Sequence, residues 1–338
     1  MKKQISRRGF LEKSAVVAGT VAASEFQGLG SAFAAPANTS PVYFTKDITV
    51  AGLLKAYAKV NQGMTGKIAV KLHTGEPHGP NLLPIELIKG LQAHVTGSTI
   101  VECNVLYPSP RQVTETHRET LKTNGFDFCP VDIMDAEGDA SLPVPGMQAL
   151  LDKYADPAIT KRPFTPGQHL TEVAVGKHLL NYDSLLVYTH FKGHTMAGFG
   201  GSLKNVAIGC ASGKVGKLQI HGEGFRRGDL FLERMVEAGK AICTHFGPHI
   251  TYINVLKNLS VDCDCDAHGA KPTAKDIGIL ASTDVLAIDK ASLDMMYALP
   301  AGERHDIIER IESRDGPHQI EYMKTLGMGN ERYELIAI

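Results

Sequence analysis

The sequence predicts an α/β fold: one large domain with a largely parallel sheet flanked by helices. Strand-like segments with alternating apolar residues follow one another with helix-like segments between them, an order typical of parallel strands. The chain has 338 residues, enough to bury a full core, and shows no internal repeat at solenoid or propeller periods. The formal net charge of -1 gives no indication of a nucleic-acid partner.

Residues 1–34 are predicted to be an export signal. The motif SRRGFL at residues 6–11 is followed by a mild apolar, alanine-rich stretch and by the cleavage pattern AFA that ends at Ala34. Paired arginines followed by Phe-Leu are typical of the twin-arginine translocase, which exports folded proteins to the periplasm or another extracytoplasmic space. The alternative is an ordinary secretory signal that carries two arginines. The apolar stretch is too short for a stable membrane span, and none is expected in the mature chain.

The first half of the chain shows a regular alternation of elements. Residues 35–65 are predicted to form a linker, polar over 36–45, and a leading helix before a domain that spans 66–338. Apolar residues alternate in the predicted strands and recur at helical spacing in the predicted helices, which end at Gly-containing turns. The elements expected here are a strand at 66–75, a helix at 82–97, a strand at 98–106 and a helix at 111–126.

The second half is less regular at its start. Six prolines interrupt residues 127–168, where only a short helix at 147–154 is expected. The same patterns then resume up to the carboxyl end. The elements expected are helices at 171–181, 230–242, 302–314 and 316–327, and strands at 183–191, 249–256, 258–264 and 283–289.

The stretch at residues 189–221 gathers histidines and lysines around a glycine-rich loop. It begins where a predicted strand ends, and ligands of open α/β sheets bind outside the carboxyl ends of the strands. We therefore expect a small-molecule ligand here, although GxxxxGK(S/T), the nucleotide-binding loop, is absent. The alternative is a tight turn whose histidines bind nothing. The groups expected to face the ligand are His190, Lys192, His194, Gly200, Gly201, Lys204 and His221.

A second candidate site is the sequence VDCDCDAHGAK, which contains Cys263, Cys265 and His268. Thiolate and imidazole ligands suit zinc or iron. In an extended strand the two cysteine Cα atoms would lie about 6.6 Å apart, at the upper edge of disulfide geometry, so we expect no bridge between them. A single C-x-C pair lacks the further cysteines of a ferredoxin cluster or a zinc ribbon. The alternative is a buried strand with two small side chains.

Three other histidines stand near expected elements. His73 and His78 follow the first predicted strand, where either a functional or a solvent-facing role is open. His117 shares one face of a predicted helix with Val113 and Leu121, which favours a core histidine by position alone.

Several motifs, in the same order, resemble the family known as domain of unknown function 362 (DUF362). They lie mainly between residues 183 and 338, with a looser likeness over 66–125. They include KNVAIG at 204–209, CDC at 263–265, DIGI at 276–279, the S-x-D-x-x-A-x-D run at 282–289 and the tail EYMKTLGMGNERYELI. The resemblance implies an α/β fold associated with iron–sulfur chemistry. This chain lacks the ferredoxin-like insert of many members, and Val285 replaces their proline.

A more distant resemblance is to the nickel-pincer lactate racemases. This chain shows Thr116-His117-Arg118, then His194, Gly200-Gly201, Lys204 and His221 in the order of those enzymes. The resemblance implies that His117 and His194 form an acid/base pair, that Lys204 anchors the cofactor, and that His221 binds the metal. Two imidazoles on either side of a Cα–H group can exchange protons near neutral pH. The chain has little room for the second domain of the racemases.

We therefore expect an exported metal- or cofactor-binding protein, with an enzyme favoured over a carrier. The expected metal is iron, nickel or zinc, or an iron–sulfur cluster, with ligands from His190, His221, Cys263 and Cys265. Proton transfer on a small hydroxy acid is the reaction that the racemase resemblance implies. One alternative is a non-catalytic iron–sulfur or electron-transfer protein. Another is a binding protein for a small anion, which would use the loop lysines and backbone amides.

Overall fold

The α/β class is confirmed by a computed structural model that describes residues 39–154 and 168–338. The predicted signal at residues 1–34 lies outside the described residues. An eight-stranded sheet has the order β12-β1-β11-β10-β7-β2-β3-β4. Seven strands run in one direction, and β11 alone is antiparallel to its neighbours β10 and β1. The strands are β1 (Thr39–Thr45), β2 (Ile68–Lys71), β3 (Thr99–Glu102), β4 (Val131–Ile133), β7 (Ser184–His190), β10 (Ile250–Leu256), β11 (Gly278–Ser282) and β12 (Arg332–Ala337).

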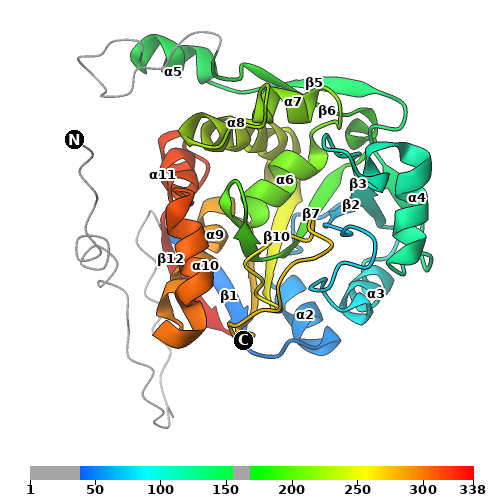
Figure 1. The fold of residues 1–338 in the computed structure, drawn as a ribbon, viewed down its shortest axis with the longest axis vertical. Helices are drawn as coiled ribbons and strands as arrows, with labels where there is room; N and C mark the ends of the chain where they lie inside the picture. The colour runs from blue at the N-terminus through cyan, green and yellow to red at the C-terminus, as the bar shows by residue number, and fades with distance from the viewer. Residues whose placement is uncertain (1–38, 155–167) are drawn as a thin grey trace. The chain divides into compact units, whose positions relative to one another are not determined.

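Helices cover both faces of this sheet (Figure 1). Helices α6, α8 and α9 belong to the core on one face, whereas α2 and α3 pack on the other. Successive residues of β7 serve the two cores in turn, because side chains of a strand point alternately to opposite faces. The helices are α2 (Val50–Tyr57), α3 (Ile85–His94), α4 (Thr114–Thr123), α5 (Met147–Tyr154), α6 (Ser202–Cys210), α7 (Gly216–His221), α8 (Asp229–Phe246), α9 (Val285–Ala298), α10 (Ala301–Ser313) and α11 (His318–Thr325). Among the described residues, no helix combines the length and apolar character that a membrane span requires.

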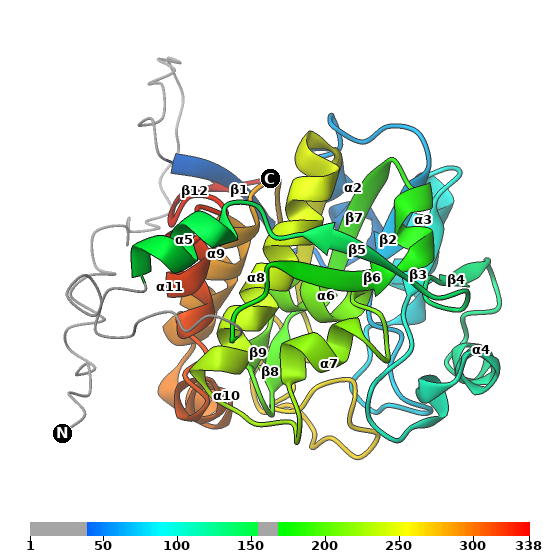
Figure 2. The same cartoon turned by 90° about the horizontal axis from the view of Figure 1, so that it is seen from above.

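Two pairs of short strands lie outside the main sheet. Strands β5 (Asp139–Pro143) and β6 (Glu172–Gly176) pair antiparallel and pack against α7 and α8 (Figure 2). Strands β8 (Lys192–His194) and β9 (Gly198–Gly200) form a second antiparallel pair directly after β7. The glycine-rich loop predicted from the sequence is therefore a small hairpin followed by helix α6.

The strand order reverses between β2 and β7. From β2 the chain continues outward to β3 and β4, and it later returns on the other side of β2 with β7 and β10. Such a reversal opens a crevice at the carboxyl ends of the two strands, where α/β proteins bind ligands. Asn205 of α6 ties the two strands together beneath this crevice: its amide donates to the carbonyl oxygens of Lys71 and Tyr188 at 3.2 and 3.1 Å.

Two segments adopt the opposite element type to the one predicted. Residues 171–181, predicted as a helix, form β6 and the 3-10 helix η2 (Lys177–Asn181), because the valines of β6 are buried where β6 pairs with the distant β5. Residues 283–289, predicted as a strand, begin helix α9. The Asp284 side chain accepts the N–H of Ala287 and caps that helix, which outweighs the strand preference of the following apolar residues.

Two further predictions are wrong for related reasons. Part of the predicted polar linker at 36–45 forms strand β1, which pairs with β11 and β12 from the far end of the chain. Residues 258–264 form an irregular loop between β10 and β11 instead of a strand. Asn258 has a φ of 50°, a left-handed conformation that ends the extended run of β10.

Candidate metal centre

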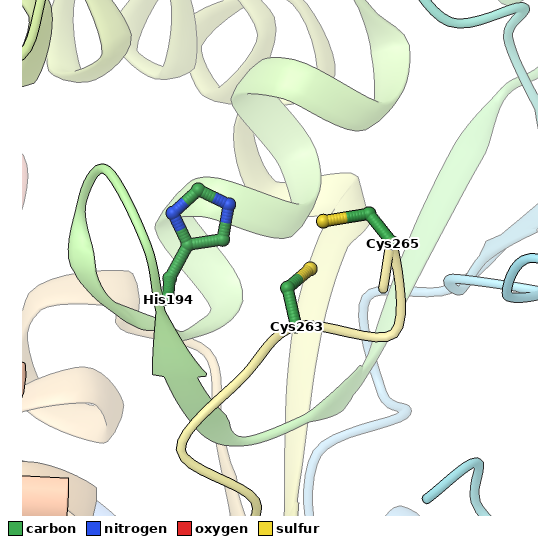
Figure 3. Close-up of side chains that lie close together, drawn as sticks. All are labelled: His194, Cys263 and Cys265. Carbon is green, nitrogen blue, oxygen red and sulfur yellow. The ribbon is translucent and has the colours of Figure 1, made fainter. Parts of the chain in front are cut away.

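Cys263 and Cys265 lie on the loop between β10 and β11, at the carboxyl edge of the sheet. One ligand atom from each of them and one ring nitrogen of His194 all lie within 4.8 Å of one another. Figure 3 shows the His194 ring with one nitrogen directed toward the two sulfur atoms. All six cysteines are free thiols. Two sulfurs and one imidazole suit a soft or borderline metal such as zinc, iron or nickel. The exposed His268 of the same loop is not part of this group.

The cysteine loop is held in place by the buried carboxylate of Asp264. His190 donates to this carboxylate from Nδ1 at 3.0 Å, and the Lys192 amine lies 2.9 Å from it. Burial alone would raise the pKa of Asp264, but His190 and Lys192 hold it well below its usual range. A Cβ atom on Gly193 would lie 2.2 Å from the Val261 carbonyl oxygen, so only glycine permits this close approach of β8 to the loop.

His190 and Lys192 therefore position the loop. The second ring nitrogen of His190, Nε2, faces the carbonyl oxygens of Lys257 and Asn258 at 2.8 and 3.1 Å. Both ring nitrogens of His190 therefore lie against oxygen atoms of the protein. Burial alone would lower the pKa of Lys192, but Asp264 and then Cys263 raise it above its usual value.

The tautomers of His194 and His73 are set by backbone amides. Nδ1 of His194 accepts the N–H groups of Met196 and Ala197 at 3.2 and 3.0 Å, and Nδ1 of His73 accepts that of Gly75 at 3.0 Å. A neutral ring with an accepting Nδ1 carries its proton on Nε2. In both rings Nε2–H is then the group available to donate to Cys263, and both side chains lower the pKa of that thiol.

These two histidines are neutral at neutral pH. Burial, and secondly the charge of Lys204, lower the pKa of His194 to about 4. Burial, and secondly Arg111, also lower the pKa of His73. Cys263 opposes both shifts, because its negative charge favours protonation of the neighbouring rings.

The pKa values of Cys263 and Cys265 shift in opposite directions. The hydrogen bond from Cys265 lowers the pKa of Cys263 well below its usual value, although burial acts in the opposite direction, and Lys204 adds to the lowering. The same bond, with burial and the charge of Cys263, raises the pKa of Cys265. Cys263 is therefore the one of the two that ionises more readily, and the thiolate is the form that binds metals.

Lys204 lies in the first turn of α6 and faces this cluster. A Cβ atom on Gly200 would lie 3.4 Å from its Cδ and 4.0 Å from Cγ of Lys192, so both lysine stems border Gly200. The charge of Lys204 lowers the pKa values of Cys263, His194 and His221. Within residues 39–154 and 168–338, its own amine has neither a hydrogen bond nor an ion pair. The Lys204 amine therefore acts on Cys263 and the two histidines through its charge, without a direct partner in these ranges.

His221 ends helix α7, and its ring lies against Phe225 and Phe231, with centroid distances of 4.8 and 4.9 Å. Its buried Nδ1 has no hydrogen-bond partner among the described residues. Burial, then Lys204 and His194, lower the pKa of His221 to about 3. Lys204 is therefore electrostatically coupled to both His194 and His221, the two histidines expected to share a ligand with it.

Gly201 has a structural role. A Cβ atom there would lie 2.5 Å from Oδ1 of Asp289. The Asp289 carboxylate, from helix α9, accepts the N–H groups of Ser202 and Leu203 at 2.8 and 2.9 Å and so caps α6. The absence of a side chain at Gly201 lets this carboxylate reach the helix end that presents Lys204.

His117 belongs to a different cluster. Its Nδ1 donates to Oδ1 of Asn104 at 3.2 Å, and its Nε2 accepts from Nε of Arg111 at 3.3 Å. Burial, and secondly Arg111, lower its pKa to about 3. In the described part of the chain its hydrogen bonds go to this cluster and none goes to His194. An acid/base role would require Arg111 to release Nε2.

A buried ionic network beneath the crevice was missed by sequence reasoning. Glu102, at the end of β3, accepts from the Lys71 amine at 2.8 Å, from Arg111 at 3.1 Å and from the Thr74 N–H at 2.9 Å. Burial alone would raise the pKa of Glu102, but Lys71 and Arg111 hold it well below its usual range. The available signal was a charged residue inside each of two successive predicted strands, Lys71 in 66–75 and Glu102 in 98–106.

Comparison with known proteins identifies the family. Residues 68–294 match the family described as domain of unknown function (DUF362). The chain belongs to the DUF362 family. Among curated proteins no significant match to the chain is found.

Two solved structures are similar to this DUF362 protein. The lactate racemase apoprotein from Thermoanaerobacterium thermosaccharolyticum has a TM-score of 0.41 and 11% identity, and the match covers 90% of this chain and 85% of that one. A structural-genomics target from Thermotoga maritima has a TM-score of 0.35 and 12% identity. This match covers 79% of the present chain and 58% of the Thermotoga chain. At these values neither similarity decides the activity.

Proposed function

We propose that this DUF362 protein is an exported metal-dependent enzyme whose metal ion is bound by Cys263, Cys265 and His194. The observation that carries the proposal is the approach of these three ligand groups to within 4.8 Å of one another. Three protein ligands are the usual number in catalytic zinc sites, which keep a further position for water or substrate. Zinc, iron and nickel all accept this donor set.

Metal binding at this site requires deprotonation. Cys265 must lose its thiol proton, and Nε2 of His194 must present a lone pair in place of its N–H group. The neutral ring would then carry its proton on Nδ1, where Met196 and Ala197 now donate. The turn at residues 195–197 is therefore expected to rearrange when the metal binds, and the Cys265 proton is released to the solvent.

Lys204 supports an anionic small-molecule ligand beside the metal. Its side chain is partly buried, and within residues 39–154 and 168–338 its amine makes no hydrogen bond or ion pair, which leaves it able to bind an anion. The carboxylate of a small hydroxy acid would provide that partner. This fits the residue order shared with the nickel-pincer racemases, in which the lysine at this position anchors the cofactor.

The reaction that this arrangement suits is proton transfer at the carbon next to the carboxylate. The metal would supply a Lewis acid that lowers the charge on the substrate oxygen. Among the described residues, the buried Nδ1 of His221 has no hydrogen-bond partner, and the charge of Lys204 lowers the pKa of His221 as it does that of His194. The His221 ring would take the Cα proton and return a proton to the same carbon, while His194 holds the metal. The free ring nitrogen favours His221 over the fully bonded His117 in this role.

The metal is tested by elemental analysis of protein purified from the cytoplasm before export. Wild-type protein is expected to hold one metal ion per chain, and Cys263→Ser, Cys265→Ser and His194→Ala are expected to lose most of it. Cys129→Ser is the matched control, because Cys129 is a partly exposed free thiol elsewhere in the fold. A metal-free wild type, or full occupancy in the three variants, would contradict the proposal. Iron with acid-labile sulfide would instead support an electron-transfer protein.

The reaction is tested by isotope exchange. Metal-loaded protein is incubated with small 2-hydroxy acids in D₂O, and deuterium at the α-carbon is measured by NMR. Lys204→Ala is expected to abolish the exchange while it retains the metal and the fold. If the loaded wild type exchanges none of these acids, the protein is a metal carrier and the catalytic part of the proposal fails.

A further inference from the structure

A small cavity lies beneath the cysteine loop, on the α3 face of the sheet. Its volume is about 70 Å³. It is bordered by the ends of β2 and β7, by the start of α3, and by His73, the residue whose ring also contacts Cys263. Most of its wall is apolar, made by Leu72, Leu82, Leu83, Ile85, Ile88 and Phe126.

In the part of the chain that the structure describes, the Tyr188 hydroxyl is the one buried side-chain group of this wall without a hydrogen-bond partner. The residue is 1% exposed, and its hydroxyl makes no hydrogen bond with any described residue. Burial raises the pKa of this phenol, so the group stays a neutral O–H. A buried hydroxyl without a partner is unfavourable, and few native structures retain one without a ligand or water to satisfy it.

The other polar groups of the wall are already satisfied by the protein. The Thr74 hydroxyl donates to Glu102 at 2.9 Å, and the Asn124 side chain both donates to three carbonyls and accepts from the His78 N–H. Both ring nitrogens of His73 and of His190 are engaged elsewhere. Among the described residues, Tyr188 therefore offers a bound molecule the one buried side-chain group of this largely apolar wall that has no hydrogen-bond partner.

These features define the occupant. A single water prefers two to four polar partners, and side chains here offer it one. A charged group would meet no counter-ion of its own, because the nearby charges of Glu102 and Asp264 are paired. A cavity of roughly 150 Å³ holds benzene, with six non-hydrogen atoms, so this one has room for about three.

We propose that this cavity binds a small neutral molecule, or the tail of a larger one, that carries one oxygen hydrogen-bonded to the Tyr188 hydroxyl. The chemical class is a short alcohol or carbonyl compound of about three to four non-hydrogen atoms. His73 lies between this cavity and the Cys263 sulfur, so the occupant is next to the candidate metal centre. The binding of this molecule in the cavity does not depend on the proposed function. Its identification as part of a substrate does.

The test uses the full chain and two probes, 1-propanol and xenon, with binding followed through the methyl NMR signals of Ile85 and Ile88. Both probes are expected to shift these signals in a saturable manner. Tyr188→Phe should weaken 1-propanol binding about fivefold, the loss of one neutral hydrogen bond, and leave xenon binding within about twofold. Tyr188→Phe should also leave the melting temperature unchanged or raised, because it removes an unpaired polar atom. Ile88→Phe fills the cavity and should abolish binding of both probes, and Ile88→Met serves the same purpose if the phenylalanine variant does not fold.

Two results would overturn the inference. Equal 1-propanol affinity in wild type and Tyr188→Phe would show that the hydroxyl does not recognise the ligand. Absence of any xenon response would show that the cavity is closed or filled by ordered water. Metal content measured on the same samples separates this inference from the proposed function: a metal-free protein that still binds 1-propanol refutes the metal centre and leaves the cavity assignment standing.

Discussion

Replacement of Gly201 by alanine should destabilise the protein through Asp289. The new Cβ atom would lie 2.5 Å from Oδ1 and 2.6 Å from Oδ2 of Asp289, closer than real Cβ atoms approach such groups. The carboxylate would have to move away from the amides of Ser202 and Leu203 that it caps. Loss of a helix cap costs about 0.5–2 kcal/mol, and a hydrogen bond to a charged group contributes about 1.5–3 kcal/mol. We expect the free energy of unfolding to fall by about 2–4 kcal/mol.

The assay is urea denaturation of Gly201→Ala beside two other variants. Gly200→Ala is the matched control, because its Cβ would lie at an ordinary 3.4 Å from Cδ of Lys204; it should change stability by less than about 1 kcal/mol. The double variant Gly201→Ala/Asp289→Ala tests the cause. If the clash acts through Asp289, the double variant loses no more stability than Asp289→Ala alone. Simple addition of the two single losses would refute the reasoning, as would equal losses at Gly200 and Gly201.

Three further outcomes are expected. The pKa of His117 is about 3 in the folded protein and about 6.5 in the unfolded chain, so its contribution to stability is present above pH 6.5 and is lost as the pH falls toward 3. In urea titrations the free energy of unfolding should therefore fall with decreasing pH by up to about 1.4 kcal/mol per pH unit. This dependence should be weaker in His117→Gln. Changing both arginines of the SRRGFL motif to lysine should leave precursor in the cytoplasm on fractionation, and normal export would remove the twin-arginine assignment. Cys263 and Cys265 should both react with a thiol label in denatured, unreduced protein, and a peptide that contains their disulfide would disprove the dithiol reading of the site.

The sequence by itself determined most elements whose signals are local. The strands at 66–75, 98–106, 183–191 and 249–256 and the short helix at 147–154 are confirmed, because period-two alternation, helical spacing and terminal glycine or proline are properties of neighbouring residues. The prediction of a ligand-binding site directly after β7 rested on the same kind of local signal, namely polar side chains at the end of a strand. Membership in the DUF362 family was also predicted from short motifs that occur in the same order as in that family.

Only the tertiary structure decided which strands pair with each other and which distant side chains come into contact. By local sequence β1 was predicted to be a polar linker, but it is a strand because β11 and β12 supply its hydrogen bonds. In the same way β6 was predicted to be helical, but it is a strand because it pairs with β5. Cys263 and Cys265 meet His194 because the loop after β10 folds over the edge of the sheet, held there by Asp264 against His190 and Lys192. The periodicity of apolar residues predicts which face of an element is buried. It does not predict which distant segment packs against that face. The roles of His190 as a support, His117 as part of a buried network and Tyr188 as an unpaired hydroxyl follow from such long-range contacts alone.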